Sequence, residues 1–279
     1  MPLSPSETRK LLRSIEHNPI KKLGQNFLID GNIVKKSIQM AGLEPAELVL
    51  EIGPGLGTLT KELLESRQHV YAVEIDPRLF GHLQSKLQKW IELKKFFPLH
   101  GDAVKFPLGS IPQNCTDFKI VANLPYAISS PWIEAVLATG KIPKSMTLML
   151  QKEASDRMYA EHNSKNYNAL CIFLHGAFSL KQIHPVPRQC FYPTPRVDSV
   201  LVQMNRIKNP FLFSNQARTT IRRIFTQRRK QIGSLAKRLA PTDQNKVLNW
   251  LEKSELSTTL RPEQIDPLAW RELAKLYRN

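Results

Sequence analysis

The sequence predicts an α/β fold in which a mainly parallel sheet is followed by a small all-α domain. Short apolar runs alternate with helical patterns between residues 48 and 150, which is typical of βαβ units. A glycine-rich turn directly follows the first apolar run, as it does in doubly wound nucleotide-binding sheets. Beyond residue 206 the apolar runs end and helical spacing takes over, which predicts the second domain.

The strands of the sheet are predicted from apolar runs that are too short for helices and suit buried strands. These runs are residues 48–52, 69–73, 96–100, 119–122 and 146–150. Helices are expected between them at residues 58–66, 77–89 and 131–138. Pro77 suits the first position of its helix because the N–H that it lacks would be unpaired there.

The remaining elements follow from proline content and helical periodicity. Two β-like runs, residues 178–184 and 197–204, flank a proline-rich segment that we expect to be irregular. Residues 206–213 are expected to form a linker, and the helices after it are residues 216–240, 243–254 and 267–277. We therefore predict two domains, residues 1–206 and 207–279, of which the first begins with a basic segment, residues 1–23.

The charge balance predicts a polyanionic partner. The formal net charge is +16 and the pI is about 9.9, which favours nucleic acid or an anionic membrane. No apolar run is long enough for a transmembrane helix, and residues 1–18 lack the apolar core of a secretory signal. The three cysteines form no CxxC pair, so we expect no disulfide framework, no metal site and a cytoplasmic location.

The glycine-rich turn, residues 51–57 (Glu-Ile-Gly-Pro-Gly-Leu-Gly), predicts a nucleoside cofactor. Glycines between a strand and a helix let the main chain approach a ligand closely, and here they are Gly53 and Gly55. Thr58 stands where a dinucleotide fingerprint would have its last glycine, which favours S-adenosylmethionine over NAD. A plain tight turn is the alternative.

Two acidic residues at strand ends are candidate cofactor contacts. Glu74 ends the second strand and is expected to accept hydrogen bonds from ribose hydroxyls, with Ile75 beside it. Asp102, followed by Ala103, ends the third strand and is expected to accept a hydrogen bond from the adenine amine of the cofactor. The alternative for each carboxylate is a local cap of a turn or helix.

The motif Asn123-Leu124-Pro125-Tyr126 predicts methyl transfer to an adenine nitrogen. The lone pair of an adenine N6 is delocalised into the ring. The side-chain oxygen of Asn123 and the carbonyl of Leu124 are expected to hold both N6–H groups and to direct that lone pair. Tyr126 is expected to stack on the base, which contributes roughly 1–3 kcal/mol. Phe191, in a Pro-rich loop, is expected to cover the second face of a flipped base; a packed loop aromatic is the alternative.

A basic helical stretch, residues 218–238, predicts phosphate contacts. It contains eight basic residues and no acidic one, with apolar residues at helical spacing. A solvated charged face and a membrane-surface helix are the alternatives. The candidate RNA-binding residues are Arg218, Arg222, Arg223, Arg228, Arg229 and Lys230.

Taken together, these motifs resemble those of the ribosomal RNA adenine dimethyltransferases that act on the small subunit. The resemblance extends over nearly the whole chain and includes residues 24–28 (Gly-Gln-Asn-Phe-Leu), 151–153 (Gln-Lys-Glu), 191–199 and 225–230. It implies that residues 25–28 close over the cofactor, with Gln25, Asn26 and Leu28 among its contacts. Asn123 is also expected to touch the cofactor.

The resemblance implies a class I S-adenosylmethionine-dependent methyltransferase (Rossmann-like) domain with a helical RNA-binding domain. It also implies dimethylation of the N6 amines of two adjacent adenines in the 3′-terminal hairpin of 16S rRNA, late in subunit assembly. We expect a monomer whose partner is the small ribosomal subunit. The alternatives are a large-subunit adenine methyltransferase that confers antibiotic resistance, a non-catalytic assembly or nucleic-acid-binding factor, and an NAD-dependent oxidoreductase.

Overall fold

The computed structural model describes residues 4–278 and divides the chain into two compact units. The sheet unit extends to Ala154 and includes Leu180–Asn205, whereas the helical unit comprises Ser155–Ser179 and the chain from Arg206 onward. The predicted boundary near residue 207 lies close to the third crossing between the units, at residues 205 and 206. A single boundary, however, assigns residues 155–179 to the first domain, whereas the structure groups them with the C-terminal helices.

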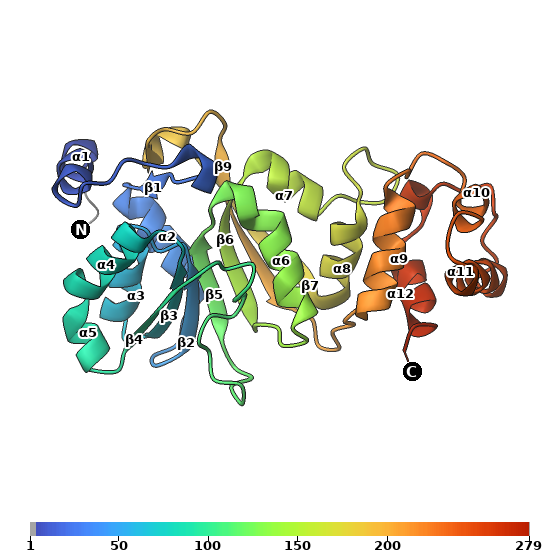
Figure 1. The fold of residues 1–279 in the computed structure, drawn as a ribbon, viewed down its shortest axis with the longest axis horizontal. Coiled ribbons are helices and arrows are strands. Elements are labelled where there is room, and N and C mark those ends of the chain that lie inside the picture. Colours follow the sequence, from blue (N-terminus) through green and yellow to red (C-terminus); the bar gives the residue numbers. More distant parts are fainter. Residues whose placement is uncertain (1–3, 279) are drawn as a thin grey trace. The chain divides into compact units, whose positions relative to one another are not determined.

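The sheet has seven strands in the order β4-β3-β2-β5-β6-β9-β7 (Figure 1). The strands β2 to β6 are parallel where they pair, and β9 runs antiparallel to β6. The bounds are Leu48–Ile52 (β2), His69–Glu74 (β3), Phe96–His100 (β4), Lys119–Asn123 (β5), Ser145–Gln151 (β6), Phe178–Val186 (β7) and Ser199–Arg206 (β9). All seven strands were predicted from the sequence, with ends displaced by at most a few residues.

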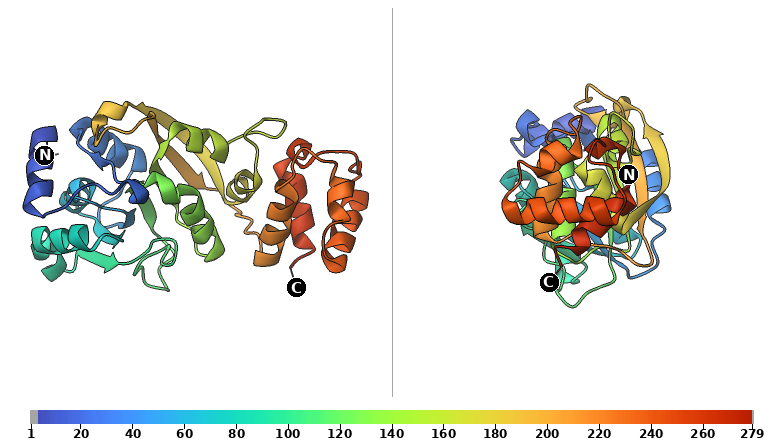
Figure 2. Two further views of the ribbon diagram at one scale, coloured as in Figure 1. Left: turned by 45° about the horizontal axis from the view of Figure 1, so that its top comes forward. Right: turned by 90° about the vertical axis from the view of Figure 1, so that its right-hand side faces the viewer.

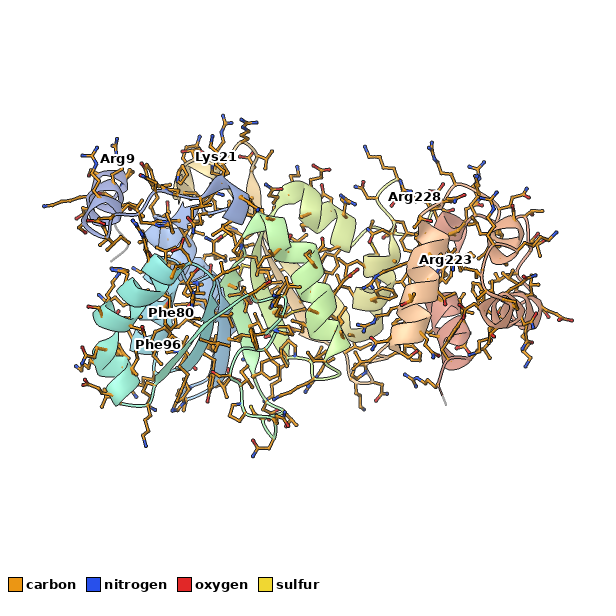
Figure 3. The ribbon with its side chains drawn as sticks, in the orientation of Figure 1. Arg9, Lys21, Phe80, Phe96, Arg223 and Arg228 are labelled. Atoms are coloured by element: carbon orange, nitrogen blue, oxygen red, sulfur yellow. The ribbon has the colours of Figure 1, made fainter. Side chains whose placement is uncertain are left out.

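The central strands are apolar along their length because both of their faces are covered. Val49 and Leu50, which are neighbours on β2, are both fully buried although their side chains point to opposite faces. At the edge of the sheet, Phe96 of β4 is buried as well (Figure 3). Because these strands are parallel, the carboxyl ends of β2, β3 and β5 meet at one edge of the sheet, where ligands bind in such folds.

Helices flank this sheet (Figure 1). They are α2 (Gly31–Ala41), α3 (Thr58–Glu65), α4 (Pro77–Lys86), α5 (Gln88–Glu92), η2 (Tyr126–Ile128) and α6 (Ser129–Ala138). Asp30 and Asp76 cap α2 and α4 by accepting hydrogen bonds from first-turn N–H groups. The predicted helix over residues 77–89 is divided at Leu87, whose φ of −112° is not helical.

The N-terminal region contains three elements that we did not predict: α1 (Pro5–Ser14), η1 (Lys21–Leu23) and β1 (Phe27–Leu28). The first begins with a capping box between Ser4 and Glu7. The strand β1 pairs with β8 (Phe191–Tyr192), which follows the short turn η3 (Arg188–Cys190) in the proline-rich segment. A two-residue strand has no readable periodicity, which is why the sequence gives no signal for it.

The helical unit is a cluster of short helices (Figure 2). They are α7 (Lys152–Met158, whose first residues belong to the sheet unit), α8 (Ala169–Ala177), α9 (Asn215–Phe225), α10 (Ile232–Ala236), α11 (Pro241–Lys253), η4 (Pro262–Gln264) and α12 (Pro267–Lys275). The prediction of one continuous helix over residues 216–240 is wrong. The N–H groups of Ile232 and Gly233 donate to the carbonyls of Leu260 and Thr258, so they cannot continue the hydrogen bonds of α9, and a new helix begins.

Residues 4–278 contain neither a membrane-spanning helix nor a cluster of metal ligands. No helix among them combines the length and apolar character that crossing a membrane requires. No group of three or more His, Cys, Asp or Glu side chains in the same part of the chain is arranged to hold a metal ion.

Candidate active site

A pocket lies at the carboxyl ends of β2, β3 and β5 in the sheet unit. It encloses about 1000 Å³, counting space that is open to solvent. Its other walls are the segment of residues 22–28, which precedes α2, residues 101–103 after β4, and residues 126–128. Every cofactor contact expected from the sequence lies in the lining: Gln25, Asn26, Leu28, Gly53, Gly55, Glu74, Ile75, Asp102, Ala103 and Asn123.

The glycine turn forms the floor of the pocket. At two of its positions, both the backbone conformation and the close neighbouring atoms require glycine. Gly53 has φ +64° and Gly55 has φ +57°, in the left-handed region that residues with a Cβ rarely adopt. A Cβ on Gly53 would lie 2.9 Å from Pro125 Cγ, and one on Gly55 would lie 3.1 Å from the ring of Phe27. The turn therefore packs directly against the Asn123–Tyr126 motif on one side and the N-terminal segment on the other.

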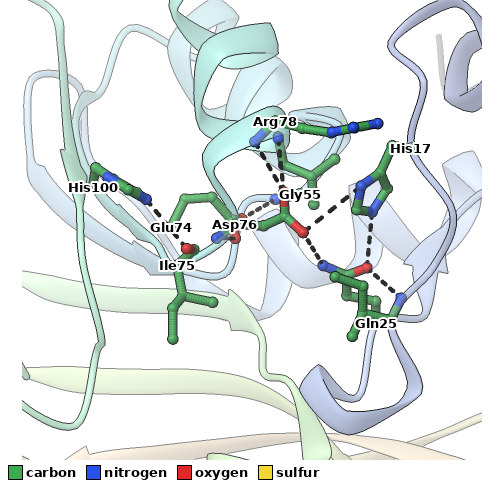
Figure 4. A network of polar contacts seen from close by, with 10 residues as sticks. His17, Gln25, Gly55, Glu74, Ile75, Asp76, Arg78 and His100 are labelled. Atoms are coloured by element: carbon green, nitrogen blue, oxygen red, sulfur yellow. Dashed lines mark hydrogen bonds and ion pairs between the residues drawn. The ribbon is translucent and has the colours of Figure 1, made fainter.

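The Glu74 carboxylate organises the pocket edge from within the protein (Figure 4). It accepts hydrogen bonds from the main-chain N–H groups of Gly55 and Asp76, both at 3.0 Å, and it is 5% exposed. Burial raises its pKa, while these two hydrogen bonds act in the opposite direction. Glu74 thus links the glycine turn to the start of α4. The predicted contact with ribose would use the remaining acceptor capacity of the same oxygens.

Glu51 is a pocket residue that sequence reasoning did not select. It lines the pocket, is 2% exposed, and its Oε2 atom has no hydrogen-bond partner among residues 4–278. Burial, with a contribution from the charge of Glu74, raises the pKa of Glu51 to about 8. A buried, unpartnered carboxyl oxygen marks a place where a ligand can bind. The sequence signal was an acid inside an otherwise apolar strand end.

A Glu51→Gln substitution is expected to remove a pH dependence of stability. Folded Glu51 keeps its proton up to about pH 8, whereas the ordinary glutamate value is 4.5. Because the folded state then binds the extra proton, its free energy of unfolding falls as pH rises from about 5 to 8. Urea unfolding at both pH values should show that wild type loses at least about 1 kcal/mol relative to the variant. A difference between the two proteins that does not change with pH would contradict this assignment.

The Asn123–Tyr126 motif reaches the pocket from the end of β5. The Asn123 amide donates from Nδ2 to the Asn26 carbonyl at 3.0 Å, so its Oδ1 remains as the acceptor. Leu124 and Pro125 also line the pocket. Tyr126 is the first residue of η2, and its side-chain hydroxyl shares a short hydrogen bond with the Ser199 hydroxyl. Burial raises the pKa of Tyr126, so its hydroxyl stays neutral. The ring is held by the main chain at one end and by the hydrogen bond to Ser199 at the other.

Two of the predicted roles meet competing contacts in the structure. Asp102 accepts a hydrogen bond from the Val104 N–H at 2.8 Å, which is the local cap expected as the alternative to a ligand contact. Phe191 does not line the pocket; it is 1% exposed and packs in the core with Leu28, its pairing partner between β1 and β8. The proposed covering of a base by Phe191 is therefore wrong for this structure. A strand pairing that sequence reasoning missed holds this side chain inside.

The candidate RNA-binding residues lie in the helical unit and differ in exposure. Arg218 is 6% exposed and contacts Asn215, so the prediction that it binds RNA is wrong. The half-buried Arg222 lies over the ring of Phe173, 5.7 Å from its centroid. The buried face of the amphipathic helix α9 includes Arg218 and Thr220 as well as its apolar residues.

The other four candidates surround the turn between α9 and α10. Arg228 donates to the Tyr167 carbonyl at 2.8 Å and pairs with Glu263 at 3.4 Å. Arg223 is exposed and donates to the Arg238 carbonyl, and both Arg223 and Arg228 are labelled in Figure 3. Arg229 and Lys230 are exposed. Arg223, Arg229 and Lys230 therefore present their charge to solvent, whereas Arg228 is partly neutralised.

Comparisons with known proteins identify the family. A sequence model described as "Ribosomal RNA adenine dimethylase" matches residues 16–269. A protein of Opitutus terrae named Ribosomal RNA small subunit methyltransferase A is 46% identical over 274 residues, or 98% of each chain. A protein of the same name from Clostridium botulinum is 35% identical over 265 residues, covering 92% of this chain and 94% of the relative.

Solved structures agree with this assignment. A dimethyladenosine transferase from Plasmodium falciparum superposes with a TM-score of 0.70 at 26% identity, covering 89% of this chain and 96% of that one. The 23S rRNA methyltransferase ErmE superposes with a TM-score of 0.63 at 25% identity, covering 90% and 98%. The fold is that of the class I methyltransferases, as predicted, and the chain belongs to the ribosomal RNA adenine dimethylase family.

Proposed function

We propose that this enzyme dimethylates the N6 amines of two adjacent adenines in the 3′-terminal hairpin of 16S rRNA, late in assembly of the small ribosomal subunit. The observation that carries the proposal is the arrangement of Asn123. Its amide nitrogen is engaged by Asn26, which leaves its oxygen as an acceptor in a pocket that also contains the glycine turn. An exocyclic amine and an activated methyl donor would thus meet at one place.

The methyl donor is S-adenosylmethionine, and the residues present fit it. Gly53 and Gly55 line the pocket without side chains, so a ligand can approach the main chain of the turn closely, and the unpartnered carboxyl oxygen Oε2 of Glu51 offers a hydrogen-bonding partner to a ligand. When bound, the cofactor supplies a sulfonium-activated methyl group. Gln25, Asn26 and Leu28 on one side and Glu74, Ile75, Asp102 and Ala103 on the other would hold it.

The protein's part in the reaction is positioning and electrostatics. The Asn123 oxygen and the Leu124 carbonyl accept the two N6–H groups, so that the nitrogen lone pair points along the direction of transfer. Tyr126 stacks on the face of the adenine ring, a contact that any base can make with an aromatic side chain. The mechanism requires no histidine as general base, because the donor is already activated and N6 releases one proton to solvent water for each methyl group, after its lone pair has formed the new bond.

The relatives support the small-subunit branch. The 46% identical protein carries the small-subunit name, whereas the large-subunit enzyme ErmE is 25% identical. The test is methyl transfer from labelled S-adenosylmethionine to undermethylated small subunits and, separately, to large-subunit rRNA. Dimethyladenine at paired positions in the small-subunit hairpin is the expected product. Label in large-subunit RNA alone, or no transfer to either, would refute the proposal.

RNA binding by the helical unit is expected to depend on the exposed turn after α9. Charge reversal at Arg229 and Lys230, Arg229→Glu with Lys230→Glu, should weaken binding to the small subunit and lower the slope of log affinity against log salt by about 1.4. The matched control reverses Lys208 and Lys253, which are exposed residues of the same unit. Equal slopes for the two double variants would show that the turn does not contact phosphates.

A further inference from the structure

We infer that the N-terminal segment forms a second phosphate-binding surface, on the sheet unit, for the RNA strand that flanks the target base. This surface, the N-terminal platform, consists of α1 and η1 with the residues between them. The inference rests on the proposed function for the identity of the RNA. It adds a contact surface at the pocket itself, independent of the basic turn in the helical unit.

The platform is docked on the sheet unit by an apolar face. Thr8 and Leu12 of α1 are buried, and Leu12 belongs to a core cluster with Phe27, Leu56 and Leu79. Leu56 lies within the glycine turn and Phe27 packs beside Gly55. Since the apolar face of α1 is already occupied, it is not free to enter a membrane interface. Its position relative to the pocket is set by the cofactor-binding turn.

A buried polar network fixes the far end of α1 (Figure 4). Asp76 receives a hydrogen bond from Gln25 Nε2 at 3.0 Å, and His17 Nδ1 lies 3.7 Å from the same carboxylate oxygen. Gln25 Oε1 in turn contacts His17 Nε2 at 2.9 Å and accepts a hydrogen bond from the Ile20 N–H at 2.8 Å. His17 and Asp76 are 5% and 3% exposed. The chain between α1 and η1 is thereby held to the start of α4.

The outer face of the platform is positive. It carries five exposed basic residues, and none of them forms an ion pair or side-chain hydrogen bond with any other residue in the range 4–278: Arg9, Lys10, Arg13, Lys21 and Lys22. Arg9 and Lys21 both point away from the ribbon in Figure 3. The acidic residues of the segment are Glu7 and Glu16, and Glu7 is engaged in the capping box. Unpaired surface cations next to a nucleotide pocket suit phosphate oxygens.

The platform reaches the pocket. Lys22, Leu23 and Gly24 line it, and a Cβ on Gly24 would lie 3.3 Å from the Tyr126 main-chain nitrogen. A strand whose adenine enters the pocket must place its neighbouring phosphates at the rim, and Lys22 stands there. The other four basic residues of the platform, Arg9, Lys10, Arg13 and Lys21, belong to α1 and η1 and do not line the pocket. RNA phosphates are therefore the partner that the charge and the position of this surface fit.

The test compares two double charge reversals in the full-length enzyme. The platform variant is Arg9→Glu with Arg13→Glu, residues one helical turn apart on the exposed side of α1. The control is Lys35→Glu with Lys89→Glu, exposed residues of α2 and α5 that do not line the pocket. Binding to undermethylated small subunits is measured over a salt series, together with KM for the particle, affinity for S-adenosylmethionine and thermal unfolding.

The platform variant should bind particles on the order of tenfold more weakly, with a salt slope lower by about 1.4. Its cofactor affinity and unfolding temperature should match those of wild type, and the control should match wild type throughout. The neutral pair Arg9→Gln with Arg13→Gln should show a smaller loss in the same direction. A loss of binding that is larger for the Glu pair than for the Gln pair, at an unchanged unfolding temperature, would show that the charge change and not misfolding weakens binding.

Two results would overturn the inference: a platform variant with the salt slope and KM of wild type, or equal losses in platform and control variants. Loss of binding to phosphatidylserine vesicles without any change on particles would also count against it. Failure of the proposed function is distinguishable, because a wild-type enzyme that does not methylate small subunits refutes that function before any variant is compared.

Discussion

An Asn123→Ala variant is expected to lose methyl transfer by about a hundredfold or more, while its affinity for S-adenosylmethionine changes much less. The substitution removes the proposed acceptor for one N6–H group of the target adenine. It also releases the Asn26 carbonyl, which the Asn123 amide binds at 3.0 Å. Single-turnover rates on undermethylated small subunits and calorimetric titration of the cofactor would measure the two effects separately.

An Asn123→Asp variant serves as the companion to this measurement. Aspartate keeps an acceptor oxygen but cannot donate to the Asn26 carbonyl, so the orientation of the side chain is lost. We expect intermediate activity from it if orientation and acceptance both matter. If Asn123→Ala transferred methyl groups at a rate within a factor of a few of wild type, Asn123 would not be the acceptor that holds N6.

A Gly53→Ala variant is expected to lose roughly a hundredfold in methyl transfer, with a marked loss of cofactor affinity. The new Cβ would lie 2.9 Å from Pro125 Cγ, so Pro125 must move, and the Asn123–Tyr126 motif moves with it. The left-handed backbone of residue 53, with φ +64°, adds strain of about 1–2 kcal/mol.

The control for Gly53 is Gly140→Ala. Gly140 also has positive φ, +75°, but a Cβ there has no heavy atom within 4 Å. Both variants should therefore unfold at reduced denaturant concentrations, Gly53→Ala at the lower one because its Cβ also clashes with Pro125, and only Gly53→Ala should lose activity and cofactor binding. Equal activity in the two variants would show that the close contact between the turn and Pro125 has no catalytic consequence.

The central strands of the sheet could be predicted because a strand buried on both faces leaves a continuous apolar record. Residues 48–52 were predicted with the bounds that the structure has, and so was the edge strand 96–100, in which Phe96 alone is fully buried. The pocket lining could be predicted for a related reason, since parallel strands place the residues that follow them at one edge. Gly53, Glu74 and Asn123 are far apart in the chain and line one pocket.

The errors have a common cause in contacts between distant parts of the chain. The proline-rich loop predicts an exposed Phe191, yet its pairing with Leu28 buries it. The charge of Arg218 predicts a surface position, yet the helical unit encloses it. Periodicity predicts one helix over residues 216–240, yet hydrogen bonds to residues 258 and 260 divide it.

The sequence by itself determined the fold class, the order of the strands along the chain, the glycine turn and the position of the Asn123–Tyr126 motif at the end of a strand, because these depend on local residue types and spacing. Only the tertiary structure decided which side chains reach the pocket or solvent, because burial is set by contacts made far along the chain. Glu51 and the Gln25–His17–Asp76 network are the clearest cases. A carboxyl oxygen left without a partner and a helix held by a buried network exist only once distant segments have packed together.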